Sequence, residues 1–279
     1  MDDTNLSEQT PKVKTGYLDA ALARKRDEVA AARWGLPLPE LKARAAGVPA
    51  ARPWAEALRG RGIAVIAEVK RRSPSAGPLD PEADPVARAR TYVENGAAAV
   101  SVVTDRDFDG RLEDLERVSR GIDLPVLRKD FLVDPWQVWE SRAAGADAAL
   151  LVVAGLPDVN LLAMAAVAHE ARLSLLVEIH GPEDIPRTLA LEPSVVGVNA
   201  RDLRTLEVDP ASAWATLEAV RGEVGDAVVL VAESGIASAE DVRRASDAGA
   251  DAVLVGEALM RAAEPGALLA DLVAAGRNP

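Results

Sequence analysis

Eight short apolar stretches recur along the chain, and a helix-like segment lies between nearly every neighbouring pair. This alternation is typical of a parallel sheet whose crossover connections are helices. The stretches are almost continuously apolar, so both faces of each strand should be buried, as in a barrel ringed by helices. The predicted strands are Ala64–Val69, Ala98–Thr104, Pro125–Lys129, Asp147–Val153, Ser174–Ile179, Val195–Asn199, Val228–Glu233 and Ala252–Gly256. The sequence therefore predicts an α/β fold, a single (β/α)8 TIM barrel.

A weak internal repeat supports this count of strands. Gly96, Gly145 and Gly249 each follow a helical segment and stand just before a predicted strand. Glycine suits the left-handed residue that commonly ends a helix. These turns belong to the N-terminal end of a barrel, where special residues usually serve stability, so we assign them no chemistry.

The chain has 279 residues, a length that one α/β barrel commonly reaches. Residues 1–14 are polar and are expected to form a flexible N-terminus. Residues 15–62 should form an N-terminal helical extension that docks on the barrel, and residues 63–279 the barrel itself. In the extension, apolar residues recur at helical spacing from Tyr17 to Trp34, and a second short helix should begin near Pro53. No linker divides the chain into two domains.

Composition excludes several classes of function. The chain has no cysteine and only two histidines, His169 and His180, which argues against disulfides, a cysteine nucleophile and a protein-held zinc site. The net charge of −12 would repel nucleic acid, so no such partner is expected. No apolar run is long enough to span a membrane, and the N-terminus lacks the pattern of a secretory signal. We therefore expect a cytoplasmic protein that makes no contact with membranes.

Charged side chains gather where the predicted strands end. Glu68 and Lys70 share one strand parity and should both point into the barrel mouth, while Lys129 and Glu178 end two further strands. A buried carboxylate must pair with a cation or take up a proton, and Lys129 or Lys70 would be the natural partner of Glu178. For any one of these residues a structural ion pair is as probable as a functional role. Their common location favours an acid–base site.

Further polar groups belong to the same rim. The sixth strand ends in Asn199 and is followed by Arg201, and the seventh ends in Glu233 and is followed by Ser234. Glycines at the last two strand ends, Gly235 and Gly256, would let backbone amides approach a phosphate closely, with Ser73 reaching across. Ser238 and Asp241 fit an ordinary helix cap instead. The predicted ligand is thus a small phosphorylated substrate.

Taken together, the strand-end segments resemble the indole-3-glycerol phosphate synthase family of tryptophan biosynthesis, in order over nearly the whole chain. The segments are Ile66-Ala67-Glu68-Val69-Lys70, Ser73-Pro74-Ser75, Pro125 to Phe131, Asp134-Pro135, Val177-Glu178, Asn199 to Leu203 and Glu233-Ser234-Gly235. The resemblance implies that the N-terminal extension covers the barrel mouth. It also implies conversion of 1-(2-carboxyphenylamino)-1-deoxyribulose 5-phosphate into indole-3-glycerol phosphate, carbon dioxide and water, without cofactor or metal.

The resemblance also implies roles for individual residues. Lys129 corresponds to the general acid that protonates the ribulose carbonyl during ring closure, and Glu178 to the acid/base residue of the final dehydration. Glu68 and Lys70 lie beside it, and Lys70 also suits the substrate carboxylate. By the same resemblance, Asn199 and Ser234 orient the anthranilate part, and Glu233 supports them. Pro74 and Phe131 line the ring pocket. The phosphate-binding positions are Ser73, Gly235, Gly256 and Glu257.

Two other interpretations remain open at this stage. Phosphoribosylanthranilate isomerase is a related phosphate-binding barrel, but it generally relies on a cysteine or aspartate pair, and this chain has no cysteine. A catalytically inactive barrel that only binds a partner, such as a neighbouring enzyme of the pathway, would have no need for the charged rim. We expect a monomer.

Overall fold

The computed structural model describes residues 16–60 and 62–277. The predicted flexible segment, residues 1–14, lies outside the described residues. No helix within the described ranges is both long enough and apolar enough to cross a membrane.

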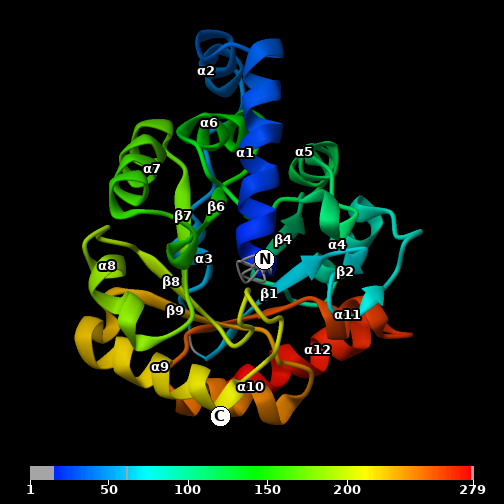
Figure 1. Ribbon diagram of the computed structural model, residues 1–279. Coiled ribbons are helices and arrows are strands. Elements are labelled where there is room, and N and C mark those ends of the chain that lie inside the picture. Colours follow the sequence, from blue (N-terminus) through cyan, green and yellow to red (C-terminus); the bar gives the residue numbers. More distant parts are fainter. Residues whose placement is uncertain (1–15, 61, 278–279) are drawn as a thin grey trace, which may run out of the picture.

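Eight parallel strands close into a barrel, which confirms the predicted fold (Figure 1). The strands are β1 (Ala64–Val69), β4 (Ala99–Val103), β5 (Val126–Lys129), β6 (Ala148–Val152), β7 (Ser174–Ile179), β8 (Val195–Asn199), β9 (Val229–Glu233) and β10 (Ala252–Val255). Each predicted strand is present, with its ends within one residue of the prediction. Each strand neighbours the next one along the chain, and β10 closes the barrel by pairing with β1.

Helices connect consecutive strands or follow the last one, and they surround the barrel. They are α4 (Pro85–Glu94), α5 (Leu112–Gly121), α6 (Pro135–Ala143), α7 (Asp158–Ala171), α8 (Ile185–Leu189), α9 (Pro210–Val224), α10 (Ala239–Asp247), α11 (Glu257–Arg261) and α12 (Pro265–Gly276). Ser238 and Asp241 form a capping box at the start of α10, as predicted. The three repeat glycines, Gly96, Gly145 and Gly249, have φ of 89°, 88° and 90°, so each occupies the left-handed conformation that glycine favours.

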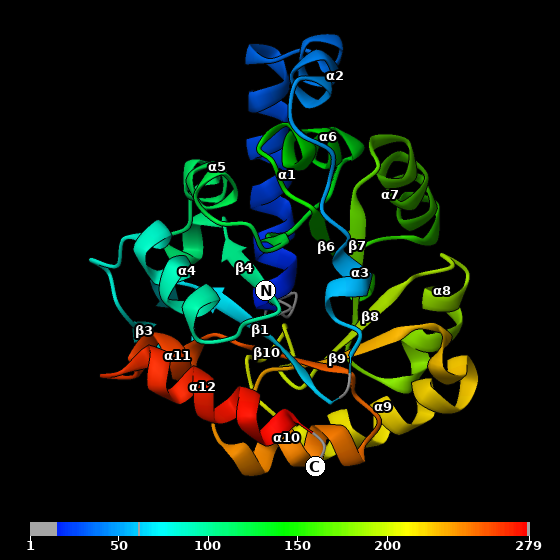
Figure 2. The same cartoon turned by 180° about the vertical axis from the view of Figure 1, so that it is seen from behind.

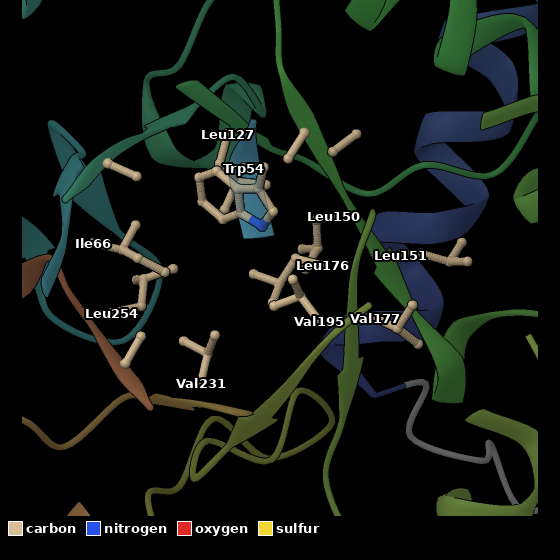
Figure 3. Close-up of a cluster of buried hydrophobic side chains, with 14 of the residues drawn as sticks. Trp54, Ile66, Leu127, Leu150, Leu151, Leu176, Val177, Val195, Val231 and Leu254 are labelled. Carbon is tan, nitrogen blue, oxygen red and sulfur yellow. The ribbon is translucent and has the colours of Figure 1, made fainter. Parts of the chain in front are cut away.

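One end of the barrel is closed by the short helix α3 (Trp54–Ala57), which begins just after Pro53 as predicted. Trp54 is fully buried and lies among the inward side chains of the strands, including Leu127, Leu176 and Val231 (Figure 3). The backbone N–H of Arg52 donates to Asp147, just before β6, at 2.7 Å. This end is therefore the N-terminal end of the strands, filled by apolar packing.

The opposite end carries helix α1 (Tyr17–Gly35), in front of the strands in Figure 1, whereas α3 lies in front in the reverse view of Figure 2. The backbone N–H of Leu18 donates to the carbonyl of Leu203, in the loop after β8, at 2.9 Å. Lys25 is buried and bridges Asp105, after β4, at 2.7 Å and Asp130, after β5, at 2.8 Å. Helix α1 is thus attached across the C-terminal ends of the strands.

One helix and one short hairpin were not predicted from the sequence. Helix α2 (Leu38–Ala46) extends the N-terminal segment and packs on α6, and the strands β2 (Arg72–Ser73) and β3 (Gly77–Pro78) form a small hairpin in the turn after β1. The described residues also contain four short 3-10 turns: η1 (Arg106–Phe108), η2 (Val153–Gly155), η3 (Pro182–Asp184) and η4 (Gly225–Ala227). The hairpin gives a defined shape to the loop that follows Glu68 and Lys70.

Candidate active site

A cavity with an empty volume of about 690 Å³ opens at the C-terminal end of the barrel. Of the predicted site residues, it is lined by Glu68, Lys70, Lys129, Phe131, Glu178, Asn199, Arg201, Glu233, Ser234 and Gly256. All residues that the sequence singled out as catalytic candidates therefore meet in one place. Four predicted binding residues, Ser73, Pro74, Gly235 and Glu257, lie outside its lining.

Lys129 occupies the centre of the charged cluster. Its Nζ donates a hydrogen bond of 2.7 Å to Oε2 of Glu178 and lies 2.9 Å from Oε2 of Glu233. Both carboxylates are almost completely buried, and the lysine side chain is 15 % exposed. Of the two cations considered for Glu178, the partner is therefore Lys129. Lys70 pairs with Glu68 instead, at 2.9 Å.

The environment separates the proton affinities of these groups. Burial lowers the pKa of Lys129, but attraction to Glu178, Glu233 and Glu68 outweighs burial and raises it. Burial raises the pKa of Glu178, yet Lys129 and His180 reverse this and hold it below its usual value. Burial raises the pKa of Glu233 to about 8, against the pull of Lys129 and with the help of Glu178. At neutral pH the cluster thus holds a protonated lysine, one carboxylate and one carboxylic acid.

This assignment predicts a pH-dependent stability that Glu233→Gln removes. Glu233 keeps its proton in the folded protein up to about pH 8 and loses it near pH 4.5 when unfolded. The folded state therefore binds more protons between these values, so stability falls as pH rises, by at most about 1.4 kcal/mol per pH unit. Urea unfolding at pH 5 to 8 should show the parent losing stability relative to Glu233→Gln.

The exposed α9 residue Glu223 offers the matched control, because Glu223→Gln makes the same carboxyl-to-amide change away from the cavity. If the difference in unfolding free energy between the parent and Glu233→Gln stayed constant from pH 5 to 8, Glu233 would not be protonated in the folded protein.

Gly197 makes room for Glu233 and was not among the predicted site residues. It lies on β8, beside Glu178 on β7, and a Cβ at this position would overlap Oε1 of Glu233. Glycine within a strand often marks a close approach of other atoms, and that was the available signal. Gly256 has a similar role, because a Cβ there would overlap Oε1 of Glu68.

Gly197→Ala should therefore displace Glu233 from Lys129. Forcing an extra methyl group into a packed interior typically costs about 1–3 kcal/mol, and we expect a loss of that size in unfolding free energy, together with reduced turnover. Gly222→Ala in α9 is the control, since nothing lies within 4 Å of its Cβ. Equal stability of the two variants would show that the site tolerates the methyl group.

Asn199 and Ser234 form a second polar pair on neighbouring strands. The Ser234 hydroxyl donates to Oδ1 of Asn199 at 2.7 Å. Ser234 has φ of 67°, a left-handed conformation that costs energy for a side chain other than glycine, and Gly235 follows with φ of 76°. Such strained residues cluster at functional sites, and Ser234 lines the cavity.

The rim beside the cavity joins three strand ends. The Ser73 and Ser75 hydroxyls are 3.0 Å apart, and Arg201 donates to Ser75 at 3.0 Å. Arg201 also lies 3.9 Å from Glu257, which follows Gly256 at the start of α11. Pro74 is half-buried beside Ser73. The predicted phosphate-binding residues Ser73 and Glu257 are therefore brought near one another through Arg201.

Several residues around the cavity escaped prediction. Tyr17 of α1 packs edge-on against Phe131, with ring centroids 6.3 Å apart. The fully buried Ser101 of β4 donates to Glu68 at 3.3 Å, and Asp105 and Asp130 line the cavity while pairing with Lys25. Two features of the sequence could have indicated these contacts. Ser101 is a polar residue inside an apolar strand, and Lys25 lies on the apolar side of a helix. Within residues 16–60 and 62–277, no group of metal-ligating side chains could hold an ion.

A buried lysine between two carboxyl groups, at the C-terminal end of a (β/α)8 barrel, defines an enzyme that moves protons on a small molecule. Its cavity is capped by an N-terminal helix and bordered by serine, arginine and glycine. The family model described as "Indole-3-glycerol phosphate synthase" matches residues 18–272, and the chain belongs to this family.

Curated relatives agree over nearly the full length. The indole-3-glycerol phosphate synthases of Streptomyces griseus and Kineococcus radiotolerans are each 46% identical to the chain, and that of Mycobacterium avium is 45% identical. These alignments cover 94% of this chain and 95–96% of the relatives.

Solved structures of lower identity share the fold. A thiamine phosphate pyrophosphorylase from Pyrococcus furiosus superimposes with a TM-score of 0.56 at 19% identity, covering 78% of this chain and 96% of that one. A mandelate oxidase gives a TM-score of 0.57 at 20% identity over 76% of this chain and 72% of that one. At such identities the likeness shows the barrel architecture alone.

Proposed function

We propose that this cavity converts 1-(2-carboxyphenylamino)-1-deoxyribulose 5-phosphate into indole-3-glycerol phosphate, carbon dioxide and water. The observation that carries the proposal is the position of Lys129, whose Nζ lies between Glu178 and Glu233 in a cavity at the strand ends. Family membership supplies the substrate and the product.

Lys129 is the general acid of ring closure. As the aromatic carbon attacks the ribulose carbonyl carbon, the ammonium group gives its proton to the carbonyl oxygen, which becomes a hydroxyl group. Loss of carbon dioxide then restores the aromatic ring. The raised pKa of Lys129 keeps the amine protonated before the reaction begins. Placement of a general acid is typically worth about 10² to 10⁴ in rate.

Glu178 serves the final dehydration, in which the new hydroxyl group leaves as water and a neighbouring carbon loses a proton. Its lowered pKa leaves it ionised and ready to accept that proton. Glu68 and Lys70, which pair at 2.9 Å at the end of β1 and line the same cavity, are the second proton-moving pair or the partner of the substrate carboxylate.

The remaining residues hold the substrate. Asn199 and Ser234 orient the anthranilate part, and Glu233 supports them from the other side of Lys129. Phe131 and Pro74 border the aromatic ring, while Arg201 joins the rim of the pocket. Ser73, Gly235, Gly256 and Glu257 surround the phosphate. Binding energy from a remote phosphate can hold both ends of a flexible molecule in attacking geometry.

The test is indole fluorescence on mixing the purified protein with 1-(2-carboxyphenylamino)-1-deoxyribulose 5-phosphate in the presence of a metal chelator. Product formation at an undiminished rate with chelator is the expected result and would support chemistry that needs no metal. Consumption or binding of phosphoribosylanthranilate instead would favour the isomerase, and binding of a phosphorylated ligand without turnover would indicate an inactive barrel.

The setting of the reaction is part of the proposal. A small phosphorylated metabolite as substrate favours the cytoplasm, and no nucleic acid or membrane takes part. The protein acts as a monomer, alone or beside neighbouring enzymes of its pathway. Size-exclusion chromatography with light scattering tests the monomer, since a mass near twice 29.3 kDa would contradict it.

A further inference from the structure

Lys25 is a buried lysine that helix α1 places behind the wall of the active-site cavity. The other buried residues of α1 are apolar, so the ammonium group lies on the packed side of this helix. Its Nζ lies 2.7 Å from Asp105, 2.8 Å from Asp130 and 3.2 Å from Glu28. A lysine is rarely buried unless it is paired, and these carboxylates supply the pairing. Lys25 therefore neutralises negative charge inside the protein.

Two of these carboxylates belong to the active site. Asp105 and Asp130 line the cavity, after β4 and β5 respectively, and each also binds an arginine. Arg24 lies 2.8 Å from Asp105, and Arg128 lies 3.0 Å from Asp130. Burial raises the pKa of Asp130, but Arg128 and Lys25 outweigh burial and lower it to about 2. The wall thus contains two ionised carboxylates beside the place where the substrate binds.

The groups that line the cavity carry more negative than positive charge. The lining contains five carboxyl groups and three cationic side chains, namely Glu68, Asp105, Asp130, Glu178 and Glu233 and Lys70, Lys129 and Arg201. With Glu233 protonated, four negative charges stand against three positive ones. The substrate of the proposed function carries a carboxylate and a phosphate, so it is itself a multiply charged anion. The net charge of the lining disfavours such an anion, and cations behind the lining are needed to reverse the sign.

Helix α1 has further attachments that do not involve Lys25. The backbone N–H of Leu18 donates to the carbonyl of Leu203 at 2.9 Å, and the indole N–H of Trp136 donates to the carbonyl of Leu36, just after α1, at 3.0 Å. Loss of the ammonium group should therefore leave α1 docked and change the charge of the wall by one unit. Salt screens a buried charge only weakly, so the change should be felt inside the cavity.

We propose that Lys25 is a positioning residue that neutralises Asp105 and Asp130 and thereby allows the cavity to bind its anionic substrate. The inference rests on the proposed function, which supplies the substrate. Helix α1 then has two tasks, because it covers the barrel mouth and also sets the charge of the site. Lys25 contributes to substrate affinity and not to proton transfer, since Lys129 and Glu178 keep their contact without it.

The test compares Lys25→Met with the parent in steady-state assays of indole-3-glycerol phosphate formation. Methionine keeps a long, flexible side chain but removes the charge. We expect KM to rise about fivefold to fiftyfold and kcat to stay within about threefold, because a charge that acts equally on bound substrate and transition state affects KM alone. Lys42→Met on α2 is the control, since it removes an exposed lysine from the same N-terminal extension, and both constants should stay within about twofold.

A second substitution separates the effect of charge from the loss of a structural contact. Asp105→Asn in the Lys25→Met background removes one negative charge, so the wall regains the net charge of the parent while the ion pair stays absent. KM should then return to within about threefold of the parent value. A KM that stays high in this double variant would show that Lys25 acts by holding α1, and would overturn the inference.

Asp105→Asn alone decides the question if circular dichroism shows that Lys25→Met does not fold. The wall then loses a negative charge while Lys25 is retained, so KM should fall below that of the parent. An unchanged or higher KM would contradict the proposed role, as would an unchanged KM in a folded Lys25→Met. These outcomes concern a parent that forms the indole product. A parent that forms none would overturn the proposed function as well.

Discussion

Replacing Lys129 with alanine should lower kcat by at least about 10³-fold while substrate binding stays measurable. The amine is the only cation within 3 Å of both Glu178 and Glu233 among the described residues, so no neighbouring group takes over its proton. The fold should survive, because carboxyl groups left without their cation can neutralise by taking up protons. Product formation at saturating substrate and a binding titration followed by fluorescence measure the two quantities separately.

A surface lysine is the matched control for this variant. Lys42 on α2 pairs with Glu170 at 2.7 Å, far from the cavity, and Lys42→Ala should stay within about twofold of the parent. Near-normal turnover of Lys129→Ala would remove Lys129 from the role of general acid. A comparable loss in both lysine variants would point to a general loss of folded protein, which circular dichroism would reveal.

The barrel could be predicted from sequence because its strands are buried on both faces. That requirement forces near-continuous apolar runs, such as Val195–Asn199, whose ends can be located to within a residue. Helix α1 was equally accessible, through its spaced apolar residues. Helix α2 and the β2–β3 hairpin were missed, because neither is long enough to display a hydrophobic period.

The sequence predicted which residues form the site, but not which cation pairs with which carboxylate. The end of a barrel strand marks Lys129 and Glu178 as neighbours before any coordinates exist. Which cation faces which carboxylate depends on side-chain direction across several strands, so the choice between Lys129 and Lys70 needed the structure. Gly197 acts through the space that it leaves for Glu233. A glycine inside a strand signals that some group approaches closely, but which group it is depends on residues distant in sequence.

Glu178→Gln should lower kcat about 10²- to 10⁴-fold with only a modest change in KM. Glutamine keeps the shape of the side chain but cannot accept the proton that dehydration releases. Lys129 still lies 2.9 Å from Glu233. Because the charge of Glu178 helps to raise the pKa of Glu233, its removal favours ionisation of Glu233 beside the lysine, and the protein should remain folded. Steady-state assays over a range of substrate concentrations separate the two constants.

The control is Glu170→Gln, an exposed carboxylate on α7 whose loss should leave both constants near the parent values. A rise in KM with kcat unchanged would make Glu178 a binding residue, since interactions equal in ground and transition states affect KM alone. A loss confined to kcat would place the proton transfer on the carboxylate itself. In that case single-turnover experiments on Glu178→Gln should show an accumulating intermediate, because ring closure depends on Lys129 and dehydration on Glu178.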